Sequence, residues 1–418
     1  MNRFWFIKKT NVYFFLTGFV GHLLLVLVFI YLMYAEHLSA RLLVSKAIDK
    51  LNMDVPVVIK VALQPEVKKE MIPMDGIIVK QHPRILLPQL ADWKSREGSQ
   101  FLKQRISAYK NNKGYLKQCG SNNFMSLTVC WLSTANDKVL KKLVRKMLAY
   151  KLNVPSADTN YSNGWQLALA YDLVFPALNI TQRSIIETRI KQALTATLLN
   201  LDEESASLWH GRSTHAAIAW VCVIVLSDRI EGIETLQRRA QAHFLTAIDA
   251  LAYTAVWPSG YNYWIQNRGF LFALASSAYL NGVTDAKNAE LVKRVMRQIG
   301  YWTLYATRPD NKIEGFGDEG SRVDLKDETR RVIDLIVQMT KDPVLAGYSK
   351  YLAKLHKSAS YYSGYRWGFL LFNDPTVRGI GNGKFSQLGQ FLSDARLFGK
   401  GATNYAYFRS GWKKGDTF

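Results

Sequence analysis

Residues 181–199 read TQRSIIETRIKQALTATLL, and this stretch decides the fold class. Its apolar side chains recur every three or four residues, as in Ile186, Ile190 and Leu194. That spacing places them on one face of an α-helix, whereas a strand would alternate at every second residue. The stretch therefore predicts an amphipathic helix that buries one face against a helical core.

The same period continues through most of the chain after Pro88. Nine further segments share it: 90–109, 139–152, 165–174, 216–226, 236–252, 270–280, 289–307, 329–339 and 344–355. Turn-forming residues separate them, such as Pro176 and the pair Asn281-Gly282. No repeat of about 34 or 40 residues is present, which argues against a TPR or HEAT array. We expect a mainly α protein in which residues 81–400 form antiparallel helix pairs, arranged as an incomplete (α/α) toroid.

Residues 12–34 form one long apolar run, VYFFLTGFVGHLLLVLVFIYLMY, in which His22 is the single ionisable side chain. At about 1.5 Å per residue the run would span about 34 Å as a helix, enough to cross a bilayer. The best match to a cleavage site behind it, Leu38-Ser39-Ala40, has leucine where a small residue is preferred. We therefore expect an uncleaved transmembrane helix.

The charges before this helix predict its orientation. Arg3, Lys8 and Lys9 precede it, and by the positive-inside rule they hold residues 1–11 in the cytoplasm. We expect a single-pass protein of the inner membrane with its main domain in the periplasm. Residues 35–80 would be a stalk or a packing arm.

The charge balance restricts the class of partner. The chain has 54 Lys and Arg against 33 Asp and Glu, a net charge of +21, which favours an anionic partner. The sequence has no RNP, zinc-finger or helix-turn-helix signature, so we expect no nucleic acid. An acidic polysaccharide and an anionic membrane surface both fit the charge.

Three cysteines are too few for a disulfide scaffold, and no Cys/His cluster predicts a metal site. Cys119 and Cys130 could pair in an oxidising compartment, but the expectation is two unpaired thiols. Cys222, within the apolar run AWVCVIVL, is expected to be a core residue.

The last residues change character. Residues 404–412, NYAYFRSGW, alternate as a β-strand does. A lone strand cannot pair its backbone, so this one pairs with strands elsewhere in the chain or opens a β domain. Residues 401–418 therefore form a segment that is distinct from the helical region 81–400.

Several motifs occur in an informative order: HPRILL at 82–87, LALAYD at 167–172, WHGRSTH at 209–215, WPSGYNYW at 257–264, FGD at 316–318 and YFRSGW at 407–412. In this order they resemble the heparinase II/III-like polysaccharide lyases, a group that includes alginate lyases. The resemblance covers about residues 80–418. It implies a helical toroid followed by a β-sandwich that residues 401–418 begin, so that the sequence is either a fragment or an incomplete lyase. It also implies β-elimination on an acidic, uronate-containing polysaccharide.

Such a lyase removes the C5 proton of a uronate and expels the O4 substituent, so the substrate carboxylate must first be neutralised. The resemblance places a histidine-containing turn at 209–215. We expect His215 to contact the carboxylate or act as a base, with His210 as the second candidate and Arg212 binding the carboxylate. For each the alternative is a structural or solvated role.

The stretch at 257–264 aligns with the part of the family that holds a catalytic tyrosine. We expect Tyr263 to be that residue, with Tyr261 as the second candidate, since tyrosine can act as both base and acid. Five further residues are expected to contact sugar: Trp209, Trp264, Gln266, Asn267 and Arg268. The alternative for the aromatic residues is packing inside the helical core. No cofactor is expected, although some relatives carry zinc in the β domain.

Two other functions stay open. The family's further histidine in the β-sandwich is absent here, which favours a non-catalytic acidic-glycan-binding protein in polysaccharide assembly or export. A glycoside hydrolase would need two carboxylates, for which Asp318-Glu319 and Asp172 are the candidates. Asp172 lies in an apolar helix, which favours a structural hydrogen-bond acceptor instead.

Overall fold

The computed structural model describes residues 79–92, 94–109, 117–151, 164–202, 209–313, 323–358, 361, 366–400 and 404–416. The chain divides into two units, Met1–Ile72 and Pro73–Phe418, and every described residue belongs to the second. The predicted transmembrane segment 12–34 lies outside the described residues. Within the described ranges, no helix is both long and apolar enough to cross a membrane.

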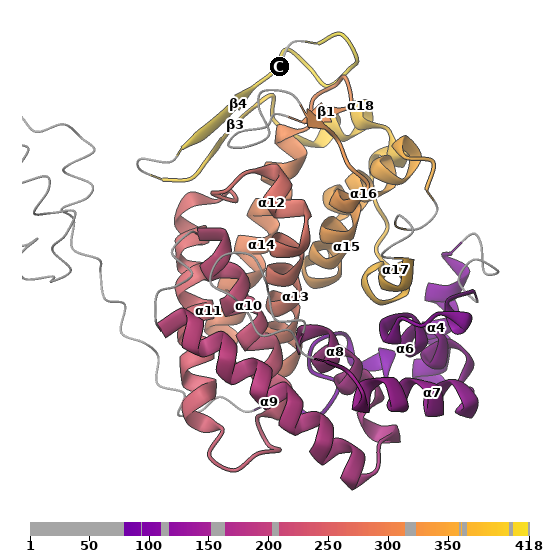
Figure 1. The fold of residues 1–418 in the computed structure, drawn as a ribbon. Coiled ribbons are helices and arrows are strands. Elements are labelled where there is room, and N and C mark those ends of the chain that lie inside the picture. Colours follow the sequence, from indigo (N-terminus) through magenta and orange to yellow (C-terminus); the bar gives the residue numbers. More distant parts are fainter. Residues whose placement is uncertain are drawn as a thin grey trace, which may run out of the picture. The chain divides into compact units, whose positions relative to one another are not determined.

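The described residues are mainly helical (Figure 1). The α-helices are α4 (Arg96–Ser107), α6 (Phe124–Thr134), α7 (Asp137–Leu148), α8 (Gly164–Val174), α9 (Ile180–Asp202), α10 (Trp209–Leu226), α11 (Glu234–Thr254), α12 (Tyr261–Ile265), α13 (Asn267–Gly282), α14 (Ala286–Ala306), α15 (Glu328–Thr340), α16 (Pro343–Leu355), α17 (Arg366–Phe372) and α18 (Phe385–Leu388). Short 3-10 helices are η1 (Pro88–Leu90), η2 (Lys117–Gly120), η3 (Phe175–Ala177), η6 (Gly381–Gly383) and η7 (Gly389–Phe391). The strands are β1 (Lys312–Ile313), β2 (Val323–Asp324), β3 (Ala395–Phe398) and β4 (Tyr405–Phe408).

Each of the ten segments predicted from periodicity contains a helix, so the mainly α class is confirmed. The sequence analysis missed α6, α12, α17 and α18. In α6 the residues from Phe124 to Leu132 are all buried, so the helix is apolar on every side and has no amphipathic period to detect.

Six helices contact one another in a closed order. α6 contacts α8, followed by α10, α13, α15 and α17, and α17 contacts α6 again. The helices α7, α9, α11, α14 and α16 each pack against members of this set. Four of the twelve largest fully buried side chains lie on the six helices of the closed order: Tyr171, Trp220, Tyr279 and Arg331.

Aromatic contacts show that three of these helices begin at the same end. Trp165, near the start of α8, packs edge-on against Phe270, near the start of α13, with ring centroids 5.7 Å apart. The guanidinium carbon of Arg331, in the first turn of α15, lies 4.1 Å from the same Phe270 ring. The helices α8, α13 and α15 therefore run in the same direction.

The helix α10 shares that direction, because it ends where α13 ends. Gly282 is the last residue of α13. A Cβ atom added to it would lie only 2.7 Å from Cγ1 of Ile224, near the end of α10. Only glycine allows so close an approach. The first turns of α10 and α13 must then lie together at the opposite end.

One buried carboxylate fastens the segment before α4 to the ends of these helices. Asp172, fully buried near the end of α8, accepts hydrogen bonds from the backbone N–H groups of Arg84 and Ile85 at 2.8–2.9 Å. Its Oδ1 also lies 2.7 Å from Nδ1 of His82. The Arg84 side chain continues to the carbonyl of Ile224, at 2.9 Å. The prediction of a structural acceptor at Asp172 is confirmed.

The cysteine prediction was wrong. Cys119 and Cys130 form a disulfide, with their Cα atoms 5.1 Å apart. Asn123 lies between them and caps α6 by accepting hydrogen bonds from Met125 and Ser126, which turns the chain so that η2 lies against α6. Cys222 is fully buried in α10, which confirms it as a core residue.

The predicted strand near the C-terminal end is confirmed as β4, and it pairs with a strand of the same chain. β3 and β4 form a two-stranded antiparallel sheet in which Arg396 lies opposite Tyr407. The sheet packs on α14, where Nε1 of Trp302 donates to the Tyr407 hydroxyl at 3.0 Å. β3 precedes residue 401, inside the range expected to be helical, because four residues are too few to show alternation.

We predict that Asp172→Asn lowers the free energy of unfolding by about 3 kcal/mol. Both carboxylate oxygens of Asp172 accept hydrogen bonds from backbone N–H groups. In either orientation the amide of asparagine would therefore point its NH₂ donor at a backbone N–H donor. Urea unfolding followed by circular dichroism measures the change. Asp92→Asn, at an exposed carboxylate, is the control and should leave stability nearly unchanged; equal stability of the two variants would contradict the role of Asp172.

Candidate active site

The residues predicted to act on a uronate lie on the first turns of α10 and around the junction of α12 and α13. Residues 209–215 do not form the expected turn before a helix, because α10 already begins at Trp209. Since α10 and α13 run in the same direction, both stretches lie at the same end of these helices. We call the first two turns of α10, together with α12 and the first turn of α13, the helix-start site.

His215 is buried in the second turn of α10, with 2% of its surface exposed. Its Nδ1 lies 2.8 Å from the carbonyl oxygen of Gly211, which can only accept, so Nδ1 carries the proton and Nε2 presents its lone pair. Burial lowers the pKa of His215, and the Gly211 carbonyl opposes that effect. The ring is therefore neutral at neutral pH, the form that can accept a proton.

Arg212 is exposed on the first turns of α10. Its positive charge acts on His243 of α11. Burial is the main cause that lowers the pKa of His243, and the charges of Arg212 and Arg239 lower it further. Arg212 thus adds positive charge beside the start of α10, where the helix dipole is also positive. The backbones of Trp209 and His210 belong to α10, and their side chains lie outside the described residues, as does that of Asn267.

The two candidate tyrosines of α12 occupy different environments. Tyr261 is fully buried, and its hydroxyl lies 2.6 Å from Thr329 Oγ1 and accepts from the backbone N–H of Lys326 at 2.9 Å. Tyr263 is half-buried, and the Arg268 guanidinium lies over its ring, 4.0 Å from the centroid. Only Tyr263 combines partial exposure with a neighbouring cation.

The other residues predicted to contact sugar are also either buried in the core or accessible at the surface. Trp264 is fully buried and packs on Trp257 with centroids 5.3 Å apart, so it has no exposed face on which a sugar could stack. Gln266 is exposed at the junction of α12 and α13, beside Arg268. The structure therefore groups Tyr263, Gln266 and Arg268 at the surface and places Tyr261 and Trp264 in the core.

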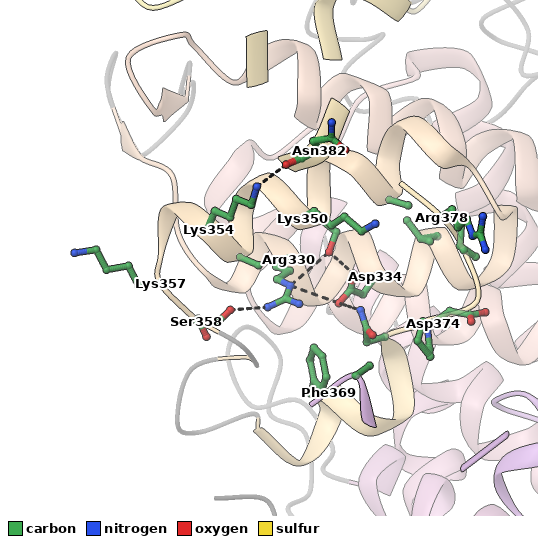
Figure 2. A pocket seen from close by; sticks show the side chains of 18 residues that line it. Arg330, Asp334, Lys350, Lys354, Lys357, Ser358, Phe369, Asp374, Arg378 and Asn382 are labelled. Atoms are coloured by element: carbon green, nitrogen blue, oxygen red, sulfur yellow. Dashed lines mark hydrogen bonds and ion pairs between the residues drawn. The ribbon is translucent and has the colours of Figure 1, made fainter. Parts of the chain in front are cut away.

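A second polar feature is lined by none of the predicted site residues. A cavity of about 920 Å³ opens between α15, α16 and the segment that follows α17 (Figure 2). Five cationic side chains line it: Arg330, Lys350, Lys354, Lys357 and Arg378. The sequence carried a signal for it, since Lys350, Lys354 and Lys357 follow at spacings of four and three residues, as on one helix face.

No group of three or more His, Cys, Asp or Glu side chains that could hold a metal occurs in the part of the chain that the structure describes. Asp318 and Glu319, the carboxylates considered for hydrolysis, lie outside that part.

Neither protein-family models nor curated proteins match this chain. The resemblance to heparinase II/III-like lyases accordingly stays a prediction based on the motifs.

We predict that the stability deficit of His215→Gln relative to the wild type becomes smaller as the pH falls below about 6.5. The unfolded histidine takes up a proton there, whereas the buried ring resists it, so the wild type loses stability on acidification. His243 behaves in the same sense but is present in both proteins, so its effect cancels. Urea unfolding at several pH values between about 5 and 7.5 measures the deficit; a deficit that grows toward low pH would contradict a neutral His215.

Proposed function

We propose that this protein is a heparinase II/III-like polysaccharide lyase that cleaves an acidic, uronate-containing polysaccharide by β-elimination at the helix-start site. The observation that carries the proposal is the common end of α10 and α13, which brings a neutral histidine and a cation-flanked tyrosine to the same end of these helices. The order of the motifs along the chain supports the same class.

The proposed scaffold is an (α/α) toroid, with α6, α8, α10, α13, α15 and α17 as inner helices and α7, α9, α11, α14 and α16 as outer helices. Its support is the closed order of contacts among the inner set and the common direction of α8, α10, α13 and α15. We further propose that β3 and β4 begin a β-sandwich. Leu397 and Phe408, 62% and 68% exposed, give the sheet an apolar outer face that further strands would cover.

In the proposed reaction Arg212 and the start of α10 bind the substrate carboxylate, since Arg212 offers two parallel donors and the helix start is positive. Tyr263 removes the C5 proton as a phenolate, a form that the Arg268 cation favours. The electron pair of the C5–H bond forms the C4–C5 double bond as the C4–O4 bond breaks. The leaving oxygen then receives a proton from the Tyr263 hydroxyl. His215 is the alternative base through its Nε2 lone pair.

We also propose that residues 12–34 anchor the protein in the inner membrane and that residues 81–400 lie in the periplasm. The Cys119–Cys130 disulfide supports this location, because disulfides persist in oxidising compartments and are rare in the cytosol.

A second candidate is a non-catalytic acidic-glycan-binding protein on the same scaffold. The burial of His215 and Tyr261 favours it, since neither side chain faces solvent. Hydrolysis has less support, because Asp172 is engaged by the segment 82–85 and is fully buried.

We predict that Tyr263→Phe lowers the rate of elimination by about 100-fold or more, because it removes the proposed general base and acid. Binding should stay nearly intact, since only one hydroxyl is lost. The assay follows the ultraviolet absorbance of the unsaturated uronate product, with uronate polysaccharides as substrates.

Tyr253→Phe is the matched control, because Tyr253 is half-exposed near the end of α11 and is not among the residues assigned to the reaction. It should retain the full rate. Full activity of Tyr263→Phe would sink the assignment of this residue.

A further inference from the structure

The cavity between α15 and α16 contains more positive than negative charge. Its five cationic side chains face two carboxylates, those of Asp334 and Asp374. A volume of about 920 Å³ is in the range of cavities that hold small organic ligands. An excess of cations in a partly enclosed space favours an anionic ligand, because low-dielectric walls strengthen the field.

The two carboxylates are already engaged within the protein. Asp334, 2% exposed, accepts hydrogen bonds from Ser349 Oγ at 2.5 Å and from the Tyr361 hydroxyl at 2.7 Å. Asp374 is bound by the ammonium group of Lys341, which lies outside the cavity lining. Asp334 also pairs with Arg330, whose Nε lies 3.8 Å from Oδ2. Neither carboxylate is paired with Lys350, Lys354, Lys357 or Arg378 among the described residues.

Three of the cations have neither an ion pair nor a side-chain hydrogen bond among the described residues. Lys350, Lys357 and Arg378 are exposed, and within the described ranges no carboxylate or carbonyl binds their charged groups. Lys354 donates to the carbonyl oxygen of Asn382 at 2.5 Å, and Arg330 donates to that of Ser358 at 3.0 Å. Lys354 and Arg330 thus bind backbone carbonyls of the cavity lining, whereas the charged groups of Lys350, Lys357 and Arg378 can bind a ligand.

The cations follow one another along the cavity. Figure 2 shows Lys357 at one side, Lys354 and Lys350 next along α16, and Arg378 at the other side. Lys350 and Lys354 are one helical turn apart, about 6 Å along the axis. A row of cations matches a chain with repeated negative charges better than it matches a single compact anion.

We propose that this cavity binds an acidic oligosaccharide, with carboxylates of neighbouring sugar units paired to Lys350, Lys357 and Arg378. It would be a second glycan-binding site, lined by none of the residues of the helix-start site. The amide side chain of Asn373, also in the lining, provides a polar neighbour for sugar hydroxyls. The choice of a uronate chain rests on the proposed function, whereas the anionic character rests on the cavity alone.

The test is a titration of the full chain, in a nonionic detergent, with a size-defined oligogalacturonate. All proteins carry Tyr263→Phe so that the ligand stays intact, and calorimetry gives the affinity and the number of sites. The cavity variant adds Lys350→Ser, Lys357→Ser and Arg378→Ser. We expect it to lose one of two binding sites or to weaken that site by about tenfold or more.

The matched control is a surface variant with Lys138→Ser, Lys141→Ser and Arg145→Ser, three exposed cations of α7. It removes the same residue types and the same net charge, and it should bind as its parent does. Equal binding by the cavity variant and the surface variant would overturn the proposal. So would binding of inorganic phosphate, lost in the cavity variant, without any binding of oligogalacturonate.

A failure of the proposed function is separable from this result. Arg212→Ser tests the helix-start site in the same titration, and the wild type tests elimination through its ultraviolet-absorbing product. A cavity site that persists while both of those tests are negative supports an acidic-glycan-binding protein without lyase activity.

Discussion

The hydrogen bonds of the buried Asp172 carboxylate are the constraint on which the arrangement of the central helices depends. The segment 82–85 donates two backbone N–H groups to this carboxylate at the end of α8. The same segment reaches α10 through Arg84 and α13 through Ser277, whose hydroxyl donates to the carbonyl of Ile85 at 2.8 Å. The ends of three neighbouring helices are thereby fastened to one short stretch of backbone.

Because the last turns of α8, α10 and α13 are held together, the positions of their first turns are also constrained. Helices held together at their last turns must present their first turns together, and those first turns carry exposed N–H groups and a positive dipole. Arg212 and Arg268 add full positive charges there. An anionic substrate would therefore meet a positive surface next to Tyr263, which is the physical basis of the proposed β-elimination.

The periodicity of the sequence predicted the helical class and ten of the helices, among them α8 and α10, which are buried on nearly every side. It missed α6, which is also buried on nearly every side, and β3, which is too short to alternate. Asp172 was assigned a structural role correctly, since an acidic side chain within an apolar helix needs buried donors. The spacing of Tyr261 and Tyr263 indicated that they would not share a helix face. Which of them is buried was not predictable, because the hydroxyl of Tyr261 is bound by Thr329 and Lys326, more than sixty residues away.

The cavity at α15 and α16 was missed for a related reason. Lys350 and Lys354 resemble solvated surface residues until the segment after α17 is placed opposite them, and that placement depends on contacts far apart in sequence. Arg105 of α4 makes one such contact by donating to the carbonyl of Leu370 at 3.0 Å. Burial lowers the pKa of Arg105 to about 10, so it still carries its charge at neutral pH.

The most direct test of the central claim is mass spectrometry of the products that the wild-type chain releases from uronate polysaccharides. We expect unsaturated oligosaccharides, each lighter by one water than the corresponding hydrolysis product. Saturated fragments would assign a hydrolase instead, and an intact polymer that nevertheless binds the protein would contradict catalysis altogether.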